Sequence, residues 1–172
     1  MKNLGNRLKK IADMVSGETI ADIGSDHGYL PIWLSLNKKI KKAYALDISP
    51  NCVEKIKKNI KKQNIPENMV IPAISDGLSY FGENPGFEEL SDIIIAGMSG
   101  ETISEIIEKM PYNINKINFI LQPNSKIESL KKFLTNNNFD ITECAVIESK
   151  KRFYTIIKCN TKKEKNDRIR IV

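Results

Sequence analysis

Runs of apolar residues alternate along the chain with segments in which apolar positions recur every three or four residues. The runs have the length and β-branched content of buried strands, and the segments between them have the spacing of helix faces. The predicted strands are 19–23, 42–46, 69–74, 92–96 and 116–121. The predicted helices are 29–36, 50–64, 100–110 and 126–136. Continuous apolar strands separated by helices indicate parallel β-α-β units, with helices covering both faces of one sheet.

Both ends of the chain extend this pattern. Apolar positions 4, 8, 11, 12 and 15 share one helical face, and Ser16-Gly17 closes that N-terminal helix. Near the other end, 140–148 and 152–159 flank the polar turn 149–151 and predict a hairpin. We therefore predict an α/β fold: a doubly wound, Rossmann-like sheet that is mostly parallel and carries a C-terminal antiparallel hairpin strand.

The predicted elements indicate a single domain. Residues 1–160, including the N-terminal helix, are expected to form it, and 161–172 to form a short basic tail without periodicity. The segment FGENPGF, before the fourth strand, is punctuated by glycine and proline and predicts a loop.

Composition narrows the class of protein. The chain has 172 residues, of which 41% are apolar and 28% charged, as in a soluble globular domain. No apolar run is long enough to span a membrane, and charged residues interrupt the N-terminal helix, unlike a signal peptide. Three widely spaced cysteines and one histidine favour neither a disulfide framework nor a metal site. We therefore expect a cytoplasmic protein without a metal.

Positive charge exceeds negative charge, with 27 Lys and Arg against 21 Asp and Glu. This surplus is compatible with a polyanionic partner but does not require one, since many lysines form pairs typical of solvated surfaces. The cations best placed to follow phosphates are Lys9, Lys10, Lys150, Lys151, Arg152, Lys162, Lys163, Lys165, Arg168 and Arg170. If they do so, RNA binding will weaken steeply as the salt concentration rises.

Polar and glycine residues follow every parallel strand of the predicted sheet. In a doubly wound sheet, ligands bind outside the carboxyl ends of the strands, where these turns gather. The turns are Gly24-Ser25-Asp26-His27-Gly28, Asp47, Asp76-Gly77, Ala96-Gly97-Met98-Ser99-Gly100 and Gln122-Pro123-Asn124. Five such turns on one edge predict a ligand site.

The first turn is acidic, which points to the kind of ligand. Its Gly-x-Asp-x-Gly pattern differs from the Gly-x-Gly-x-x-Gly of dinucleotide sites, and Asp26 opposes a pyrophosphate while attracting an amine or a sulfonium. Asp47 has the position to accept from ribose hydroxyls, and Asp76 from an adenine amino group, with Gly77 letting the ring lie close. S-adenosylmethionine fits all of these features, whereas NAD fits only Asp47.

Each of these residues also has a simpler structural explanation. Asp47 and Asp76-Gly77 are common turn residues, and His27 is able to brace its own turn. Gly97 and Gly100 would serve equally to let a helix pack closely on a strand. Taken together, these explanations would need to coincide at the end of every strand.

Four motifs resemble one group of class I methyltransferases, the bacterial tRNA (adenine-22-N1)-methyltransferases. The motifs are Ala21–Pro31 (ADIGSDHGYLP), Asp76-Gly77-Leu78, Ile95–Gly100 (IAGMSG) and Leu121–Asn124 (LQPN). The resemblance spans about residues 4–159. It implies a Rossmann-like fold, S-adenosylmethionine as cofactor, and transfer of a methyl group to N1 of an adenine in tRNA.

The sequence departs from this family in two places. Ser99 stands where the family usually has a glycine, so we expect the backbone φ of Ser99 to be negative. The family's C-terminal helical region, thought to help hold the tRNA, is absent from this sequence and is expected to be either truncated or replaced by another RNA-binding surface.

Position in the predicted fold assigns the site residues. The residues expected to bind the cofactor are Gly24, Ser25, Asp26, Asp47, Ile48, Asp76, Gly77, Ala96, Gly97 and Met98. The residues expected at the reacting groups are Asp26, His27, Tyr29 and Asn124. Asp26 is expected at the charged end of the cofactor and Tyr29 or Asn124 at the base, while His27 orients either.

Two alternatives remain. A small-molecule methyltransferase would use the same cofactor site, under a compact lid and without salt-sensitive RNA binding. A non-catalytic RNA-binding relative is disfavoured by the retained Asp26, Asp47 and Asp76, because a buried carboxylate costs stability unless it is paired. For partners we expect tRNA, no membrane and no metal, and a monomer or weak homodimer.

Overall fold

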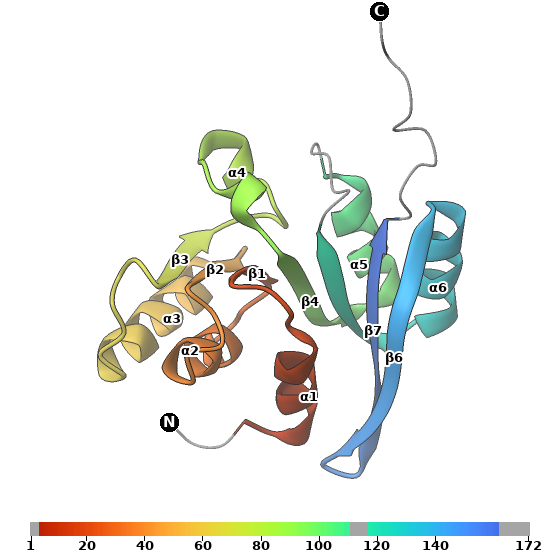
Figure 1. Cartoon of the computed structure of the whole chain (residues 1–172), viewed down its shortest axis with the longest axis horizontal. Coiled ribbons are helices and arrows are strands. Elements are labelled where there is room, and N and C mark those ends of the chain that lie inside the picture. Colours follow the sequence, from red (N-terminus) through yellow and green to blue (C-terminus); the bar gives the residue numbers. More distant parts are fainter. Residues whose placement is uncertain (1–3, 111–116, 162–172) are drawn as a thin grey trace, which may run out of the picture.

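A seven-stranded sheet in the order β3-β2-β1-β4-β5-β7-β6 forms the centre of the molecule (Figure 1). The computed structural model describes residues 4–110 and 117–161. The strands are β1 (Thr19–Ile23), β2 (Lys42–Asp47), β3 (Val70–Ile74), β4 (Asp92–Ser99), β5 (Asn118–Ser125), β6 (Phe139–Ser149) and β7 (Arg152–Thr161). The first five pair in parallel, and β7 runs antiparallel to both β5 and β6. This confirms the predicted fold class.

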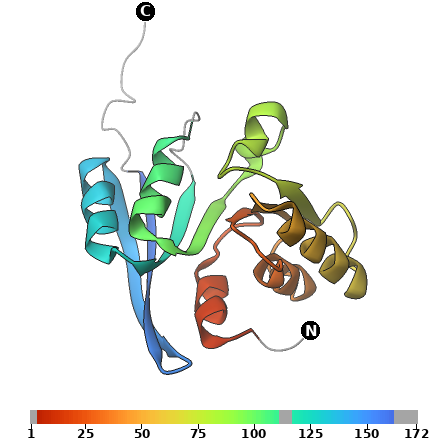
Figure 2. The ribbon, with the colours of Figure 1, turned by 180° about the vertical axis from the view of Figure 1, so that it is seen from behind.

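Helices cover both faces of the sheet, as Figures 1 and 2 show from opposite sides. One face carries α1 (Asn6–Met14), α2 (Tyr29–Leu36) and α3 (Pro50–Lys62), and the other carries α5 (Gly100–Glu108) and α6 (Ile127–Asn136). Side chains of the buried strands alternate between two apolar clusters: Ile94 packs in the α1–α3 cluster, and its neighbours Ile93 and Ile95 in the α5–α6 cluster. The continuous apolar runs therefore follow from burial on both faces.

Most element boundaries follow the sequence pattern, but the segment predicted as a loop before β4 contains structure. It forms a short helix, α4 (Tyr80–Glu83), and a 3-10 turn, η1 (Phe87–Glu89). Phe81 and Phe87 are 5% exposed and their rings pack edge to face, which anchors the segment on the sheet despite its glycines and proline. The predicted tail from 162 onwards, with its five cations, and Lys116 lie outside the described residues.

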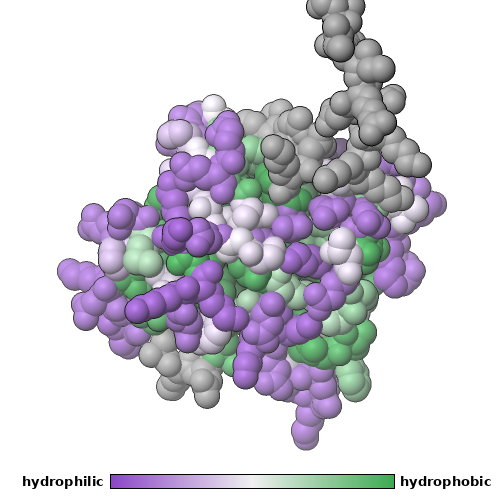
Figure 3. All heavy atoms as spheres, in the orientation of Figure 1, coloured by the Kyte–Doolittle hydropathy of each residue, from purple (hydrophilic) through white to green (hydrophobic). Residues whose placement is uncertain are grey.

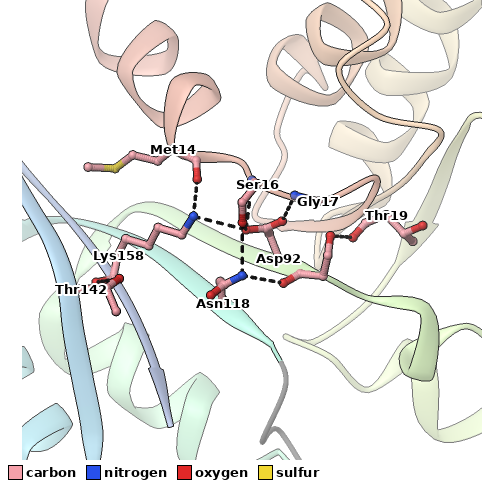
Figure 4. A network of polar contacts seen from close by, with 9 residues as sticks. Met14, Ser16, Gly17, Thr19, Asp92, Asn118, Thr142 and Lys158 are labelled. Carbon is pink, nitrogen blue, oxygen red and sulfur yellow. Dashed lines mark hydrogen bonds and ion pairs between the residues drawn. The ribbon is translucent and has the colours of Figure 1, made fainter. Parts of the chain in front are cut away.

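A buried polar network joins the elements at the amino edge of the parallel strands (Figure 4). Asp92, the first residue of β4, is fully buried and accepts from the Ser16 hydroxyl at 3.0 Å and from the Gly17 amide at 2.8 Å. The Lys158 ammonium lies 4.0 Å from Asp92 and donates to the Met14 carbonyl at 2.7 Å. The network fixes the end of α1 against β4 and β7, and so determines where α1 begins at the opposite edge.

Candidate functional site

Two cavities lie side by side at the carboxyl edge of the parallel strands, and Gly24 lines both. The larger has a volume of about 660 Å³, within the usual range for small-molecule sites. Six of the predicted cofactor residues line it: Gly24, Asp47, Ile48, Asp76, Gly77 and Met98. The smaller cavity, of about 110 Å³, is lined by the predicted Ser25, Asp26, His27, Tyr29 and Ala96. The structure thus gathers eleven predicted residues around one connected site.

The two remaining predicted residues, Gly97 and Asn124, lie outside both linings but contact each other. The Asn124 amide group donates to the Gly97 carbonyl at 2.8 Å, and its side-chain oxygen accepts from Gln122 at 3.0 Å. The Gly97 φ of 85° is one that glycine adopts readily. The contact joins the ends of β4 and β5 beside the smaller cavity.

The acidic first turn is held against the end of β2. The amides of Gly24 and Ser25 donate to the Leu46 carbonyl at 2.8 and 3.0 Å, and the Asp26 amide donates to a carboxylate oxygen of Asp47 at 2.9 Å. Gly24 has a φ of 71°, and a Cβ there would collide with the terminal methyl of Met98. The backbone conformation therefore favours a glycine at the point where the two cavities meet.

Asp47 combines its structural and its predicted binding role. It is 8% exposed, and its second carboxylate oxygen accepts from the Ser49 amide at 2.9 Å. Because a carboxylate has about four acceptor positions, the two amide donors leave capacity for ribose hydroxyls. Ile48, beside it, is 67% exposed and gives the cavity an apolar wall.

Asp76 and Gly77 form a turn that also shapes the larger cavity. The Ser79 amide donates to the Asp76 carbonyl at 3.1 Å, and the Ser79 hydroxyl accepts from the Asp76 amide at 3.2 Å. Gly77 has a φ of 57°, and a Cβ there would lie 3.3 Å from Ile106. The missing side chain therefore leaves room between this turn and α5.

Burial separates the three carboxylates that sequence analysis treated alike. The Asp26 side chain is 62% exposed and Asp76 is exposed, so only Asp47 carries a desolvation cost. The argument that buried carboxylates disfavour a non-catalytic relative is therefore wrong for Asp26 and Asp76 and holds for Asp47 alone.

His27 and Tyr29 form a stacked aromatic pair at the mouth of the smaller cavity. Their ring centroids are 5.0 Å apart and the planes differ by 7°. Tyr29 is 47% exposed, and Nε2 of His27 lies 3.6 Å from an Asp26 carboxylate oxygen. The pair presents an accessible ring face, which suits stacking of an unpaired base.

Sequence analysis missed Asp22, which lines the smaller cavity and is 6% exposed. Its carboxylate accepts from the Ser25 hydroxyl at 2.6 Å. The pKa of Asp22 is raised to about 6, mainly because the side chain is buried; the Ser25 hydrogen bond lowers this pKa, the nearby Asp47 raises it, and Arg7 lowers it. The signal was a carboxylate inside the apolar run TIADI, because a buried carboxylate needs compensation by a partner, a ligand or a shifted pKa.

Arg7 was also missed, because nothing near it in sequence marks a site. It reaches the smaller cavity from α1 and donates to the side-chain oxygen of Gln122, which is fully buried. Its guanidinium carbon lies 5.7 Å from the centroid of the Tyr154 ring. Similarly, one face of α5 lines the larger cavity with Thr102, Glu105 and Ile106, and Lys109 directly after the helix also lines it.

The end of β4 tests the expectation for Ser99 and one of the structural alternatives, that for Gly100. Ser99 has a φ of −71° and caps α5 by accepting from the Thr102 amide at 3.1 Å, so the expected negative φ is confirmed. A Cβ on Gly100 would collide with the Lys126 carbonyl, so Gly100 serves close packing of α5 on α6.

Neither a metal cluster nor a membrane span is found in the described parts of the chain. Within them, no three His, Cys, Asp or Glu side chains are grouped to hold a metal ion. No helix among the same residues is long and apolar enough to cross a membrane.

Comparison with known proteins identifies the family. The model of a methyltransferase domain matches residues 4–157. The chain belongs to this methyltransferase family. Its sequence is 29% identical over 156 residues to the Bacillus subtilis tRNA (adenine(22)-N(1))-methyltransferase, a match that covers 90% of this chain. This methyltransferase domain spans 63% of the length of that relative.

Solved structures agree with this family. Mycoplasma capricolum TrmK in complex with S-adenosyl-homocysteine is 31% identical, with a TM-score of 0.82 over 92% of this chain and 69% of that one. A Streptococcus pneumoniae relative in complex with S-adenosyl-L-methionine is 28% identical, with a TM-score of 0.84 over 92% and 73%. These matches confirm the resemblance to tRNA (adenine-22-N1)-methyltransferases that the four sequence motifs indicated.

Proposed function

We propose that this methyltransferase uses S-adenosylmethionine to methylate N1 of adenine 22 in tRNA. The observation that carries the proposal is the pair of cavities that meet at Gly24. Asp47 and Asp76 line the larger cavity as hydrogen-bond acceptors, and two further carboxylates, Asp22 and Asp26, line the smaller one. The named activity of the Bacillus subtilis relative and the cofactor complexes of the solved relatives support it.

The residues present fit the proposed cofactor. In the larger cavity, Asp47 would hold ribose hydroxyls, Ile48 would contact the adenine ring, and Asp76 would accept from its amino group beside Gly77. The smaller cavity offers two carboxylates, Asp22 and Asp26, and one guanidinium, Arg7. This mixture of signs suits an amino-acid group that carries an ammonium and a carboxylate.

When bound, this cofactor supplies a methyl group on a positively charged sulfur. N1 of adenine has an in-plane lone pair, so no side chain needs to remove a proton before the new carbon–nitrogen bond forms. As the carbon–sulfur bond breaks, its electron pair stays on sulfur and the positive charge moves to the base. The main task of the protein is therefore to unstack the adenine and align N1 with the methyl group.

Three side chains at the mouth are proposed to perform this alignment. The stacked His27 and Tyr29 rings would support the face of the unstacked base. Asn124, already fixed between Gln122 and Gly97, would contact the base edge, and its oxygen would stabilise the exocyclic amino group as that group becomes more acidic. Asp26, in the smaller cavity, would attract the charged end of the cofactor and so favour binding of the positively charged cofactor.

The test is methyl transfer from labelled cofactor to unmodified tRNA, with the product nucleoside identified by mass spectrometry. We expect 1-methyladenosine, lost when adenine 22 of the tRNA is replaced by guanine. Calorimetry of the wild type and of Asp47→Ala measures cofactor binding separately. Label in a small molecule, or cofactor binding without transfer to any RNA, would replace the proposal by one of the two alternatives.

Further features remain part of the proposal. We place the reaction in the cytoplasm, where tRNA substrates occur, and expect a monomer or weak homodimer. Because the proposed chemistry needs no metal, activity should persist in a chelator. Size-exclusion chromatography and an assay with EDTA test these two points.

A further inference from the structure

The β6–β7 hairpin extends beyond the sheet at the edge where the site lies. The last pair between β5 and β7 is Leu121 with Ile157, whereas β7 begins at Arg152. Because β7 is antiparallel to β5, its first residues point toward the carboxyl edge of the parallel strands. At about 3.3 Å per residue, residues 152–156 reach about 17 Å past that pair. Figure 1 shows this arm, residues 145–156, as the lowest part of the molecule.

The tip of the arm is a strained and strongly basic turn. Ser149 pairs with Arg152, and the two residues between them, Lys150 and Lys151, have φ values of 52° and 61°. Such two-residue turns favour Asn and Gly, because other side chains resist positive φ. None of the ion pairs formed within residues 4–110 and 117–161 involves Lys150, Lys151 or Arg152. The turn holds these two lysines in a strained backbone conformation although they form no ion pair with the described residues, which indicates that their charge has a function.

One face of the arm packs on the protein and the other is open. Ala145 and Ile147 pack with α1 in the apolar cluster of that face. On the opposite face, Val146 is 64% and Phe153 76% exposed. Figure 3 shows the hydrophilic lower tip with apolar surface beside it. An exposed aromatic ring beside three cations, with Glu148 as the nearest acid in sequence, has the composition of a single-strand RNA contact.

Polar contacts connect the arm to the mouth of the smaller cavity. Asn6 at the start of α1 donates to the Glu148 carbonyl at 3.4 Å, and Arg7 covers the Tyr154 ring. Arg7 also bonds Gln122, which in turn bonds Asn124. A nucleic acid lying on the arm would therefore approach the site from the β5 side.

We propose that this arm is a docking surface for the acceptor RNA. Lys150, Lys151 and Arg152 contact its phosphates, and Phe153 stacks on an unpaired base next to the target. The proposal rests on the proposed function, because it takes the acceptor to be tRNA.

The decisive variant replaces the turn by the residues that its backbone favours, Lys150→Asn with Lys151→Gly, in the full chain. We expect the melting temperature to rise by about 2–4 °C, since strain is removed. At the same time, the dissociation constant for tRNA should rise about tenfold at 0.1 M salt, and the salt dependence should fall by about 1.5 in log–log slope. A variant that is more stable yet binds RNA less well excludes misfolding as the cause.

The matched control is Lys61→Gln with Lys62→Gln, which removes the same charge from the last turn of α3, at the amino edge of the sheet. This control should leave tRNA binding within about twofold and the slope nearly unchanged. Phe153→Thr, which keeps a strand-forming residue, should weaken tRNA binding at least about fivefold without changing the salt slope. In both arm variants, KM for tRNA should rise while kcat and the calorimetric affinity for S-adenosylmethionine stay constant.

The outcomes separate the two proposals. If the wild type binds and methylates tRNA but the arm variants match it in affinity and slope, the docking surface is wrong and the proposed function stands. If the α3 control weakens tRNA binding as much as the arm variants do, the loss of positive charge alone explains the effect, and the proposed docking surface is likewise wrong. If the wild type binds cofactor but neither binds nor methylates tRNA, the proposed function fails, and the docking surface with it.

Discussion

Two buried aspartates on adjacent strands, Asp92 and Asp22, differ in how the protein compensates their charge. Asp92 begins β4 at the amino edge, is fully buried, and is surrounded by donors from Ser16 and Gly17 and by the Lys158 ammonium. Asp22 lies near the end of β1, two residues after Ile20, the residue that pairs with Asp92, and it is 6% exposed. It has one hydroxyl donor, Ser25, and faces the like charge of Asp47.

The contrast distinguishes a structural carboxylate from a binding one. A fully hydrogen-bonded buried charge stabilises one arrangement of the chain, here the junction of α1 with β4 and β7. An under-compensated carboxylate beside a cavity destabilises the free protein and is compensated when a positively charged ligand arrives. The same residue type thus marks scaffold at one edge and site at the other.

The largest expected effect is that of Asp92→Ala. Removing this carboxylate leaves the Gly17 amide without its acceptor and the Lys158 ammonium, which keeps the Met14 carbonyl, without its counter-charge, so the free energy of unfolding should fall by about 4 kcal/mol. Urea denaturation measures it. Asp140→Ala, on the exposed face of β6, is the matched control and should cost less than about 0.5 kcal/mol. A loss for Asp92→Ala as small as that of the control would show that the network is dispensable.

Asp22→Asn should change stability in the opposite direction. The pKa of Asp22 is about 6 in the folded protein against 3.8 ordinarily, so the folded state binds the proton more tightly. This group therefore costs nothing below pH 3.8, and its cost grows as the pH rises to 6 and is complete above that. The variant should be more stable by about 2 kcal/mol at pH 7 and by much less at pH 4.

Urea denaturation at these two pH values tests the sign. An Asp22→Asn protein that is less stable at pH 7 would place Asp22 with Asp92 among the structural carboxylates. Cofactor affinity, measured by calorimetry on the same samples, should fall despite the gain in stability, because the proposed cationic ligand loses an opposing charge.

Local pattern was sufficient for the scaffold and for the turns of the site. The sequence spacing predicted α2 as 29–36 and β1 as 19–23, which the structure reproduces, because both depend on apolar periodicity and on adjacent turn residues. The topology rule then placed Asp47, Asp76 and the first turn on one edge without any contact being known.

What the sequence did not reveal depends on packing between distant segments. Arg7 enters the site because apolar packing and the Asp92 network hold α1 in place, and no local feature of the sequence records that. Asp22 was concealed inside an apolar run, and the cavity face of α5 follows from how that helix lies on the sheet. The α4–η1 segment folds because Phe81 packs on Tyr44 and on Phe87 in one apolar cluster, which outweighs the segment's loop-like composition.

The pH dependence of cofactor affinity tests directly whether the charge of Asp22 contributes to binding. S-adenosylmethionine carries a sulfonium charge that S-adenosylhomocysteine lacks, so the ratio of their affinities reports the charge of the site. With a pKa of about 6, Asp22 is mostly neutral at pH 5 and ionised at pH 7.5. The ratio should therefore rise about fivefold between these pH values in the wild type and stay flat in Asp22→Asn. His27→Gln is the control, since it removes the imidazole beside Asp26 but leaves Asp22 in place, and it should keep the rise.

The smallest expected effect concerns Ser99, which shows that lying on the carboxyl edge does not by itself make a residue functional. Ser99 caps α5 through the Thr102 amide and has a φ that any residue adopts. Because glycine is also an acceptable N-cap, Ser99→Gly should cost only about 0.3 kcal/mol, whereas Ser99→Ala should cost about 1 kcal/mol. Both should leave the affinity for S-adenosylmethionine unchanged in calorimetry. A loss of affinity in Ser99→Gly at full stability would move this residue from the scaffold to the site, beside Met98 and Thr102, which line the larger cavity.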